Sequence, residues 1–190
     1  MTECRFRRLS FEDYLDAAVS GDMNVIRNMI EYRKEKNPAD LAGNTPLHEA
    51  AAQGHVEAVK LILLTVQEKN PANMVGLTPL HAAAGDGRVE VVKLILQAVE
   101  EKNPANKDGW TPLHATAQQG HAEVVKLILP TLQEKNPAGK DGWTPLHSAA
   151  AKGHVEVVNL ILESVTEKNP KAKNGSTPLH VAHLEDMSRL

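Results

Sequence analysis

The chain of 190 residues is poor in aromatic side chains, which make up 3% of it, and it contains a single cysteine, Cys4. One cysteine cannot form an internal disulfide, and no apolar segment of the signal-peptide type follows Met1. We therefore expect a cytoplasmic protein, with the nucleus as the alternative. No apolar run approaches the roughly 20 residues that a transmembrane helix needs. The formal net charge of -3 provides no basic excess for nucleic acid, so we expect neither a membrane nor a nucleic-acid partner.

The chain does contain the tetrapeptide Thr-Pro-Leu-His, five times at intervals of 33 residues, beginning at Thr45, Thr78, Thr111, Thr144 and Thr177. A fixed period of this length, in units too small to bury their own apolar face, predicts a stacked solenoid. Threonine can cap a helix and proline fits the first helical position, so a helix is expected to begin at the same point of each unit. The histidine is placed to hydrogen-bond the threonine or a neighbouring turn, which indicates a structural role.

The period and the pattern Thr-Pro-Leu-His-x-Ala are those of ankyrin repeats, and the chain resembles an ankyrin-repeat protein over nearly its whole length. The resemblance implies an all-α solenoid of stacked helix-turn-helix units with projecting, β-hairpin-like turns. We treat residues 1–190 as a single solenoid. It divides into a degenerate N-terminal capping repeat (1–36), four full repeats (37–69, 70–102, 103–135 and 136–168) and a C-terminal half repeat (169–190).

The end of the second helix in each repeat departs from the usual ankyrin pattern. Many family members have a glycine there, but this chain has Val66 and its equivalents. We therefore expect the helix to run on through residues 67–69 until Asn70 and Pro71 end it. Pro130 predicts a kink or an early helix end in one repeat.

The N-terminal segment contains a pattern that predicts the start of a helix. Ser10 and Asp13 resemble a capping box at the start of a helix. The sequence Arg7-Arg8-Leu9-Ser10 also has the form of a kinase site, but the cap is the interpretation that we favour.

Catalytic and metal-binding patterns are missing. Eight of the nine histidines follow the repeat period, so equivalent imidazoles lie about 10 Å apart, too far to share a metal ion with ligand bonds near 2 Å. His180 and His183 stand one helical turn apart and supply at most half of a zinc site. Cys4 has no base beside it that would make it a nucleophile. We therefore expect no enzymatic activity, no cofactor and no bound metal.

The resemblance also implies that the turns before each Thr-Pro-Leu-His and the exposed face of the first helices form a concave surface that binds partner proteins. The residue before the threonine is large and apolar in three consecutive repeats, as Leu77, Trp110 and Trp143. These tryptophans either anchor a partner or pack against the adjacent turn, and the sequence leaves both alternatives open. The candidate partner-binding residues are Met74, Val75, Leu77, Asp86, Lys107, Asp108, Trp110, Gln118, Lys140, Asp141, Trp143 and Lys152, with Glu49 and Gln119 as further contacts.

The function that we expect is that of a non-enzymatic, monomeric module that binds a partner protein on its concave face. A first alternative is an engineered or consensus-like repeat scaffold without a native partner. It is favoured by the agreement of residues 78–110 with residues 111–143 at 23 of 33 positions. A second alternative is a regulatory fragment of a larger protein.

Overall fold

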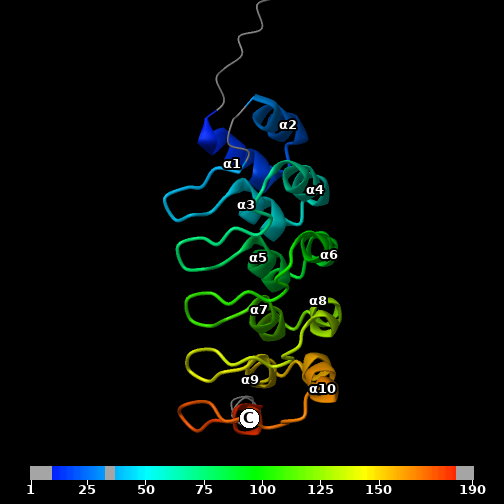
Figure 1. Ribbon diagram of the computed structural model, residues 1–190. Helices are drawn as coiled ribbons and strands as arrows, with labels where there is room; N and C mark the ends of the chain where they lie inside the picture. The colour runs from blue at the N-terminus through cyan, green and yellow to red at the C-terminus, as the bar shows by residue number, and fades with distance from the viewer. Residues whose placement is uncertain (1–9, 33–36, 183–190) are drawn as a thin grey trace, which may run out of the picture.

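The computed structural model describes residues 10–32 and 37–182 as a column of stacked helix pairs (Figure 1). The first helices of the pairs pack against one another along the column, and so do the second helices. We call the first set the inner helices and the second set the outer helices. The inner helices are α1 (Phe11–Ser20), α3 (Pro46–Gln53), α5 (Pro79–Gly85), α7 (Pro112–Gln119) and α9 (Pro145–Ala151). The outer helices are α2 (Met23–Tyr32), α4 (Val56–Thr65), α6 (Val89–Ala98), α8 (Ala122–Ile128) and α10 (Val155–Ser164).

The expected all-α solenoid is confirmed, and the described ranges contain helices and turns but no strand. Residues 178–182 begin a further inner helix beyond α10. The core runs through the column between the two sets of helices, with side chains such as Leu80 and Leu113 from the inner helices and Ile95 and Ile128 from the outer ones, all fully buried.

Two side chains fix the start of each inner helix after α1. The hydroxyl of Thr78 accepts a bond from the backbone N–H of His81 at 3.4 Å, and Pro79 occupies the first turn, as the sequence predicted. A second cap was not predicted. The side-chain oxygen of Asn70 accepts from the backbone N–H of Leu80 at 3.0 Å. Asn37, Asn103, Asn136 and Asn169 make the same bond in their own repeats.

The prediction that the second helix runs on through residues 67–69 is wrong. Helix α4 ends at Thr65, and Val66 already has an extended backbone (φ -92°, ψ 149°). The ammonium group of Lys69 folds back and donates to the carbonyl oxygens of Leu63 and Val66. A lysine side chain therefore satisfies the last carbonyls of this helix, whereas in many helices a turn at a glycine does so. Lys102, Lys135 and Lys168 repeat this cap.

Pro130 acts as the sequence predicted. Helix α8 ends at Ile128, and the chain tightens into a short 3₁₀ helix, η1 (Leu129–Thr131). A proline has no N–H to donate to a carbonyl one turn earlier, so the α-helical pattern cannot continue through it. The other four outer helices each contain ten residues, whereas α8 contains seven.

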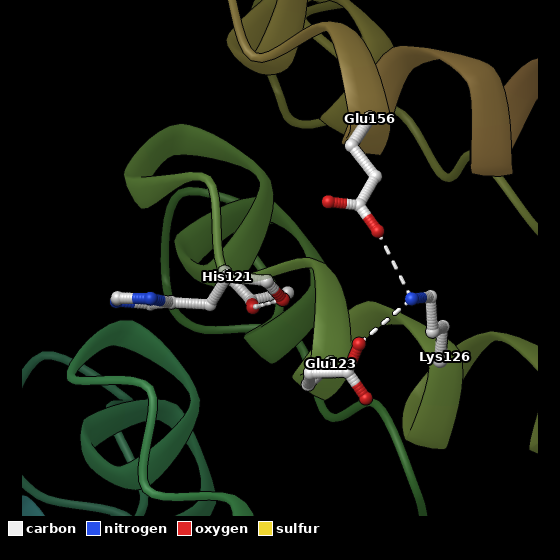
Figure 2. A network of polar contacts seen from close by, with 5 residues as sticks. His121, Glu123, Lys126 and Glu156 are labelled. Atoms are coloured by element: carbon white, nitrogen blue, oxygen red, sulfur yellow. Dashed lines mark hydrogen bonds and ion pairs between the residues drawn. The ribbon is translucent and has the colours of Figure 1, made fainter.

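Two further polar features lie on the surface. Ser10 and Asp13 form the expected capping box at the start of α1, with bonds of 2.6 and 3.0 Å. On the outer helices, Lys126 bonds Glu123 at 2.7 Å and reaches Glu156 of the next repeat at 2.9 Å (Figure 2). The bonds to Glu123 and then Glu156 raise the pKa of Lys126. Such exposed pairs contribute little to stability, so this face is chiefly a solvated one.

Candidate functional site

Five short hairpins project from the column on the side of the inner helices, and they appear as the row of loops beside α3, α5, α7 and α9 in Figure 1. We call them the fingers and number them one to five: residues 40–44, 73–77, 106–110, 139–143 and 172–176. Each is closed by a bond from its first N–H to its last carbonyl, for example from Asn106 to Trp110 at 2.7 Å. Each finger ends at the residue that precedes the threonine of the repeated tetrapeptide.

Neighbouring fingers are joined through their backbones. The N–H of Lys107 donates to the carbonyl of Val75 at 3.1 Å, and that of Lys140 donates to the carbonyl of Asp108 at 2.8 Å. A left-handed glycine permits this approach: Gly76 has φ +85°, and a Cβ there would lie 2.8 Å from the nitrogen of Lys107. The fingers therefore form a bonded row, on which side chains of successive repeats stand side by side.

The histidine of the tetrapeptide ties each of fingers two to five to the preceding inner helix. The Nδ1 atom of His81 accepts from the backbone N–H of Thr78 at 3.1 Å. The proton of the neutral ring must then be on Nε2, which donates to the carbonyl of Trp110 at 3.1 Å. His48, His114 and His147 make the equivalent pair of bonds, so the expected structural role of these side chains is confirmed.

Burial keeps these imidazoles neutral. It lowers the pKa of His81 and of His114 to about 4, against a smaller opposing effect of the bond to the next finger. Burial also lowers the pKa of His48 and His147. A neutral ring can accept on one side and donate on the other, whereas a charged ring can only donate. The position of the fingers thus depends on histidines that stay unprotonated at neutral pH.

A second row of histidines lies near the other end of the inner helices. The Nε2 atoms of His55, His121 and His154 donate to the carbonyls of Val19, Gly85 and Gln118 in the preceding repeat, at 2.8 to 3.0 Å. These bonds give the second row a structural role, because each ring joins its own repeat to the preceding one. No group of three or more metal-binding side chains occurs in the described ranges. Cys4 and His183 lie outside the described residues.

Exposed apolar side chains gather on the first two fingers. Nine large hydrophobic residues are exposed in the described part of the chain, and four of them are on these fingers: Leu41, Met74, Val75 and Leu77. Leu41 is 96% exposed and Met74 is 65% exposed. Leu41 is not among the candidate residues that the sequence indicated, although it occupies the same position of its finger as Met74.

The two tryptophans are half-buried, and each ring packs on the histidine of its own repeat. The ring centres of Trp110 and His114 are 5.2 Å apart, and those of Trp143 and His147 are 5.0 Å apart. The indole N–H of Trp143 donates to the hydroxyl of Ser148 at 3.1 Å. One face of each ring is therefore used in packing, while part of each side chain remains open to solvent.

The candidate residues fall into two groups. Nine of them stand on the fingers: Met74, Val75, Leu77, Lys107, Asp108, Trp110, Lys140, Asp141 and Trp143. Asp86, Gln118 and Lys152 lie at the far ends of α5, α7 and α9, about 10 Å from the fingers along helices of seven or eight residues. Glu49 lies nearer, in the first turn of α3, and burial together with the charge of Asp40 raises its pKa. The finger group alone forms a continuous row.

Comparison with known proteins agrees with this architecture. No helix in the described ranges is both long and apolar enough to cross a membrane. The family model of ankyrin repeats (3 copies) matches residues 15–105, 61–138, 97–172 and 132–188. No curated protein matches the chain. These overlapping matches agree with the repeated tetrapeptide, the stacked helix pairs and the bonded fingers. The chain belongs to the ankyrin-repeat family.

Proposed function

We propose that this chain is a non-enzymatic module that binds a partner protein along the row of fingers, over Leu77, Trp110 and Trp143. Ankyrin repeats are generally modules of protein–protein interaction. The observation that carries the proposal for this chain is the cluster of Leu41, Met74, Val75 and Leu77 on two adjacent fingers. Apolar side chains that gather on one exposed surface mark interaction sites, whereas scattered ones do not.

The fingers suit such a role physically. Their backbones are bonded to one another and to the inner helices, so a partner does not have to order them on binding. The half-buried tryptophans offer a rigid edge next to the flexible side chains of Met74 and Lys107. We infer that the partner covers fingers one to four and that Asp86, Gln118 and Lys152 are contacts at the margin of the interface. The module is monomeric and acts in the cytoplasm or the nucleus.

The proposal can be tested with a variant that carries Met74→Ser and Leu77→Ser. Both side chains are exposed, so the fold should not change. Proteins captured from a cell extract by the wild-type chain are identified by mass spectrometry, and the purified candidate is titrated by calorimetry. We expect the variant to bind at least about tenfold more weakly, because apolar anchors at the centre of an interface carry much of the affinity.

The matched control is Leu64→Ser. Leu64 is also exposed, but it lies on the outer helix α4, away from the fingers. Equal binding by the wild type and both variants would contradict the proposed surface. If neither the wild type nor a variant captures a specific protein, the result would favour the alternative of a repeat scaffold without a partner. The similarity of residues 78–110 to residues 111–143 supports that alternative.

A further inference from the structure

Finger one carries a negative charge that its own fold does not require. A carboxylate oxygen of Asp40 accepts the backbone N–H groups of Ala42 and Asn44 at 2.8 and 2.7 Å. In fingers two and three, the neutral amides of Asn73 and Asn106 accept the two equivalent bonds. Because an asparagine makes both bonds, the fold of the finger does not need the charge of Asp40.

A second charge of this kind lies in the first turn of α3. Glu49 is half-buried there, and the same position of the later inner helices holds Ala82, Ala115 and Ser148. Those helices begin with the same threonine and proline as α3. The start of an inner helix therefore does not depend on a carboxylate at this position.

The two carboxylates are close enough to repel each other. Burial raises the pKa of Glu49, and the charge of Asp40 raises it further. A carboxylate in the first turn of a helix is normally stabilised by the helix dipole, which lowers its pKa, so the opposite shift marks a charge in an unfavourable place. Neither carboxylate forms an ion pair with a cationic side chain in the described part of the chain. The pair lacks a positive counterpart.

Exposed apolar side chains adjoin this acidic pair. Leu41, which is 96% exposed, follows Asp40 directly in finger one. The backbone N–H of Met74 donates to the carbonyl of Ala42 at 2.8 Å, so Met74 stands on the adjacent finger of the bonded row. Complementary charge selects one partner over another, because like charges brought together at an interface are costly. The end of the row at fingers one and two thus suits a segment that is both cationic and apolar.

We propose that the partner segment places a lysine or arginine side chain on Asp40 and Glu49, next to an apolar side chain that packs on Leu41 and Met74. This inference rests on the partner-binding role proposed above. It adds the chemistry of the segment that binds and assigns Glu49 and Asp40 as the residues that select it. A cationic head has three or more N–H donors and can therefore bond both carboxylates at once.

The test begins with a displayed library of random short peptides selected on the intact protein. We expect the selected peptides to carry lysine or arginine beside a large apolar residue. A fluorescent copy of one such peptide is then titrated against Glu49→Ala and Asp40→Asn, which introduce residues that other repeats have at these positions. Each substitution should weaken binding roughly tenfold, the effect of losing one bond between charged groups, and should leave the thermal unfolding midpoint near that of the wild type.

The matched control is Glu57→Ala on the outer helix α4 of the same repeat. It removes a carboxylate whose ion pair with Lys60 is exposed, so it should change peptide binding by less than about twofold.

Two further measurements identify a direct contact. Replacing the cationic residue of the peptide by glutamine should weaken binding to the wild type but have little further effect on Glu49→Ala, as expected for two groups that touch. The pKa of Glu49, followed by NMR spectroscopy, is raised in the free protein and should fall when the peptide binds, because a nearby cation favours the charged carboxylate. A pKa that stays raised in the complex would contradict the contact.

The outcomes separate this inference from the proposed function. Selected peptides without cationic residues, or equal effects of Glu49→Ala and Glu57→Ala, would overturn the role of the acidic pair. Binding that still depends on Met74 and Leu77 would then leave the proposed surface intact. Peptide binding that is insensitive to Met74→Ser and Leu77→Ser, or a library that yields no binding peptide, would overturn both.

Discussion

The Nε2 atom of His114 donates a hydrogen bond of 3.1 Å to the carbonyl oxygen of Trp143, 29 residues further along the chain. On the other side of the same ring, Nδ1 accepts from the backbone N–H of Thr111 at 3.1 Å. One fully buried imidazole thus connects the start of its own inner helix to the finger of the next repeat. The stability of the column and the geometry of the row of fingers therefore depend on the same side chains.

The first prediction concerns this connection. His114→Ala leaves the N–H of Thr111 and the carbonyl of Trp143 without partners and opens a cavity, so we expect the free energy of unfolding to fall by about 2–4 kcal/mol. Urea unfolding at pH 7.5 measures the change. The control is His180→Ala, because His180 is exposed and, among the described residues, its side chain bonds only Thr177. A loss of under about 1 kcal/mol is expected there, and equal losses would contradict the role of the connection.

The second prediction is a loss of stability in mild acid. Burial lowers the pKa of His81 and His114 to about 4 in the folded chain, while an unfolded histidine titrates near 6.5. Between these values the unfolded chain binds more protons than the folded one, so the free energy of unfolding falls as the pH falls from about 6.5 towards 4. His81 and His114 each contribute on the order of 3 kcal/mol to this loss.

Urea midpoints measured at pH 7.5, 6.0 and 5.0 check this prediction. The histidine variant His114→Gln provides the control, since it removes one of the titrating groups and should show a shallower fall of stability over the same range. Midpoints that stay constant down to pH 5 would show that protonation of the buried rings does not oppose folding.

The sequence predicted those elements of the fold that local chemistry determines. Threonine and proline at the start of the tetrapeptide marked the beginning of the inner helices α3, α5, α7 and α9. Pro130 marked the end of α8. Each of these residues acts on the backbone beside it. Lys69 was misread as part of a helix. Its side chain folds back over six residues to the carbonyl of Leu63, and a run of polar residues suits a last helical turn as well as it suits this cap.

For the candidate site, the sequence identified the row of residues but not the difference between its members. The period of 33 residues placed Leu77, Trp110 and Trp143 at the same position of their repeats. In the fold, the ring of each tryptophan packs on the histidine four residues later in the sequence. Whether an indole N–H remains free depends on the residue five places further on, Ala115 or Ser148. That relationship requires the geometry of the helix start, which the sequence pattern alone does not contain.

The third prediction uses two glycines with the same backbone but different neighbours. Gly87 has φ +68° and Gly153 has φ +67°, so alanine at either position is strained by about 1 kcal/mol. A Cβ at Gly87 would also lie 2.7 Å from Nδ1 of His121, whereas at Gly153 no atom of the described residues lies within 4 Å. We therefore expect Gly87→Ala to destabilise by roughly 2–3 kcal/mol and Gly153→Ala by about 1 kcal/mol. Thermal and urea unfolding measure both, and equal costs would show that the imidazole moves aside freely.

The fourth prediction tests the lysine that ends each outer helix. Lys102→Met keeps the apolar stem of the side chain but removes the ammonium group that donates to the carbonyls of Leu96 and Val99. Because no glycine turn follows α6 to satisfy these carbonyls, we expect a loss of about 1–2 kcal/mol in urea unfolding. The control on the same helix is Lys93→Met, which removes only the exposed pair with Glu90 and should change stability by less than about 0.5 kcal/mol. If the two variants were equally stable, water would satisfy the carbonyls at the helix end as well as the lysine does. The sequence Glu-Lys-Asn-Pro, which follows α6 as residues 101–104 and recurs in the other repeats, would then stabilise the fold through its asparagine cap alone.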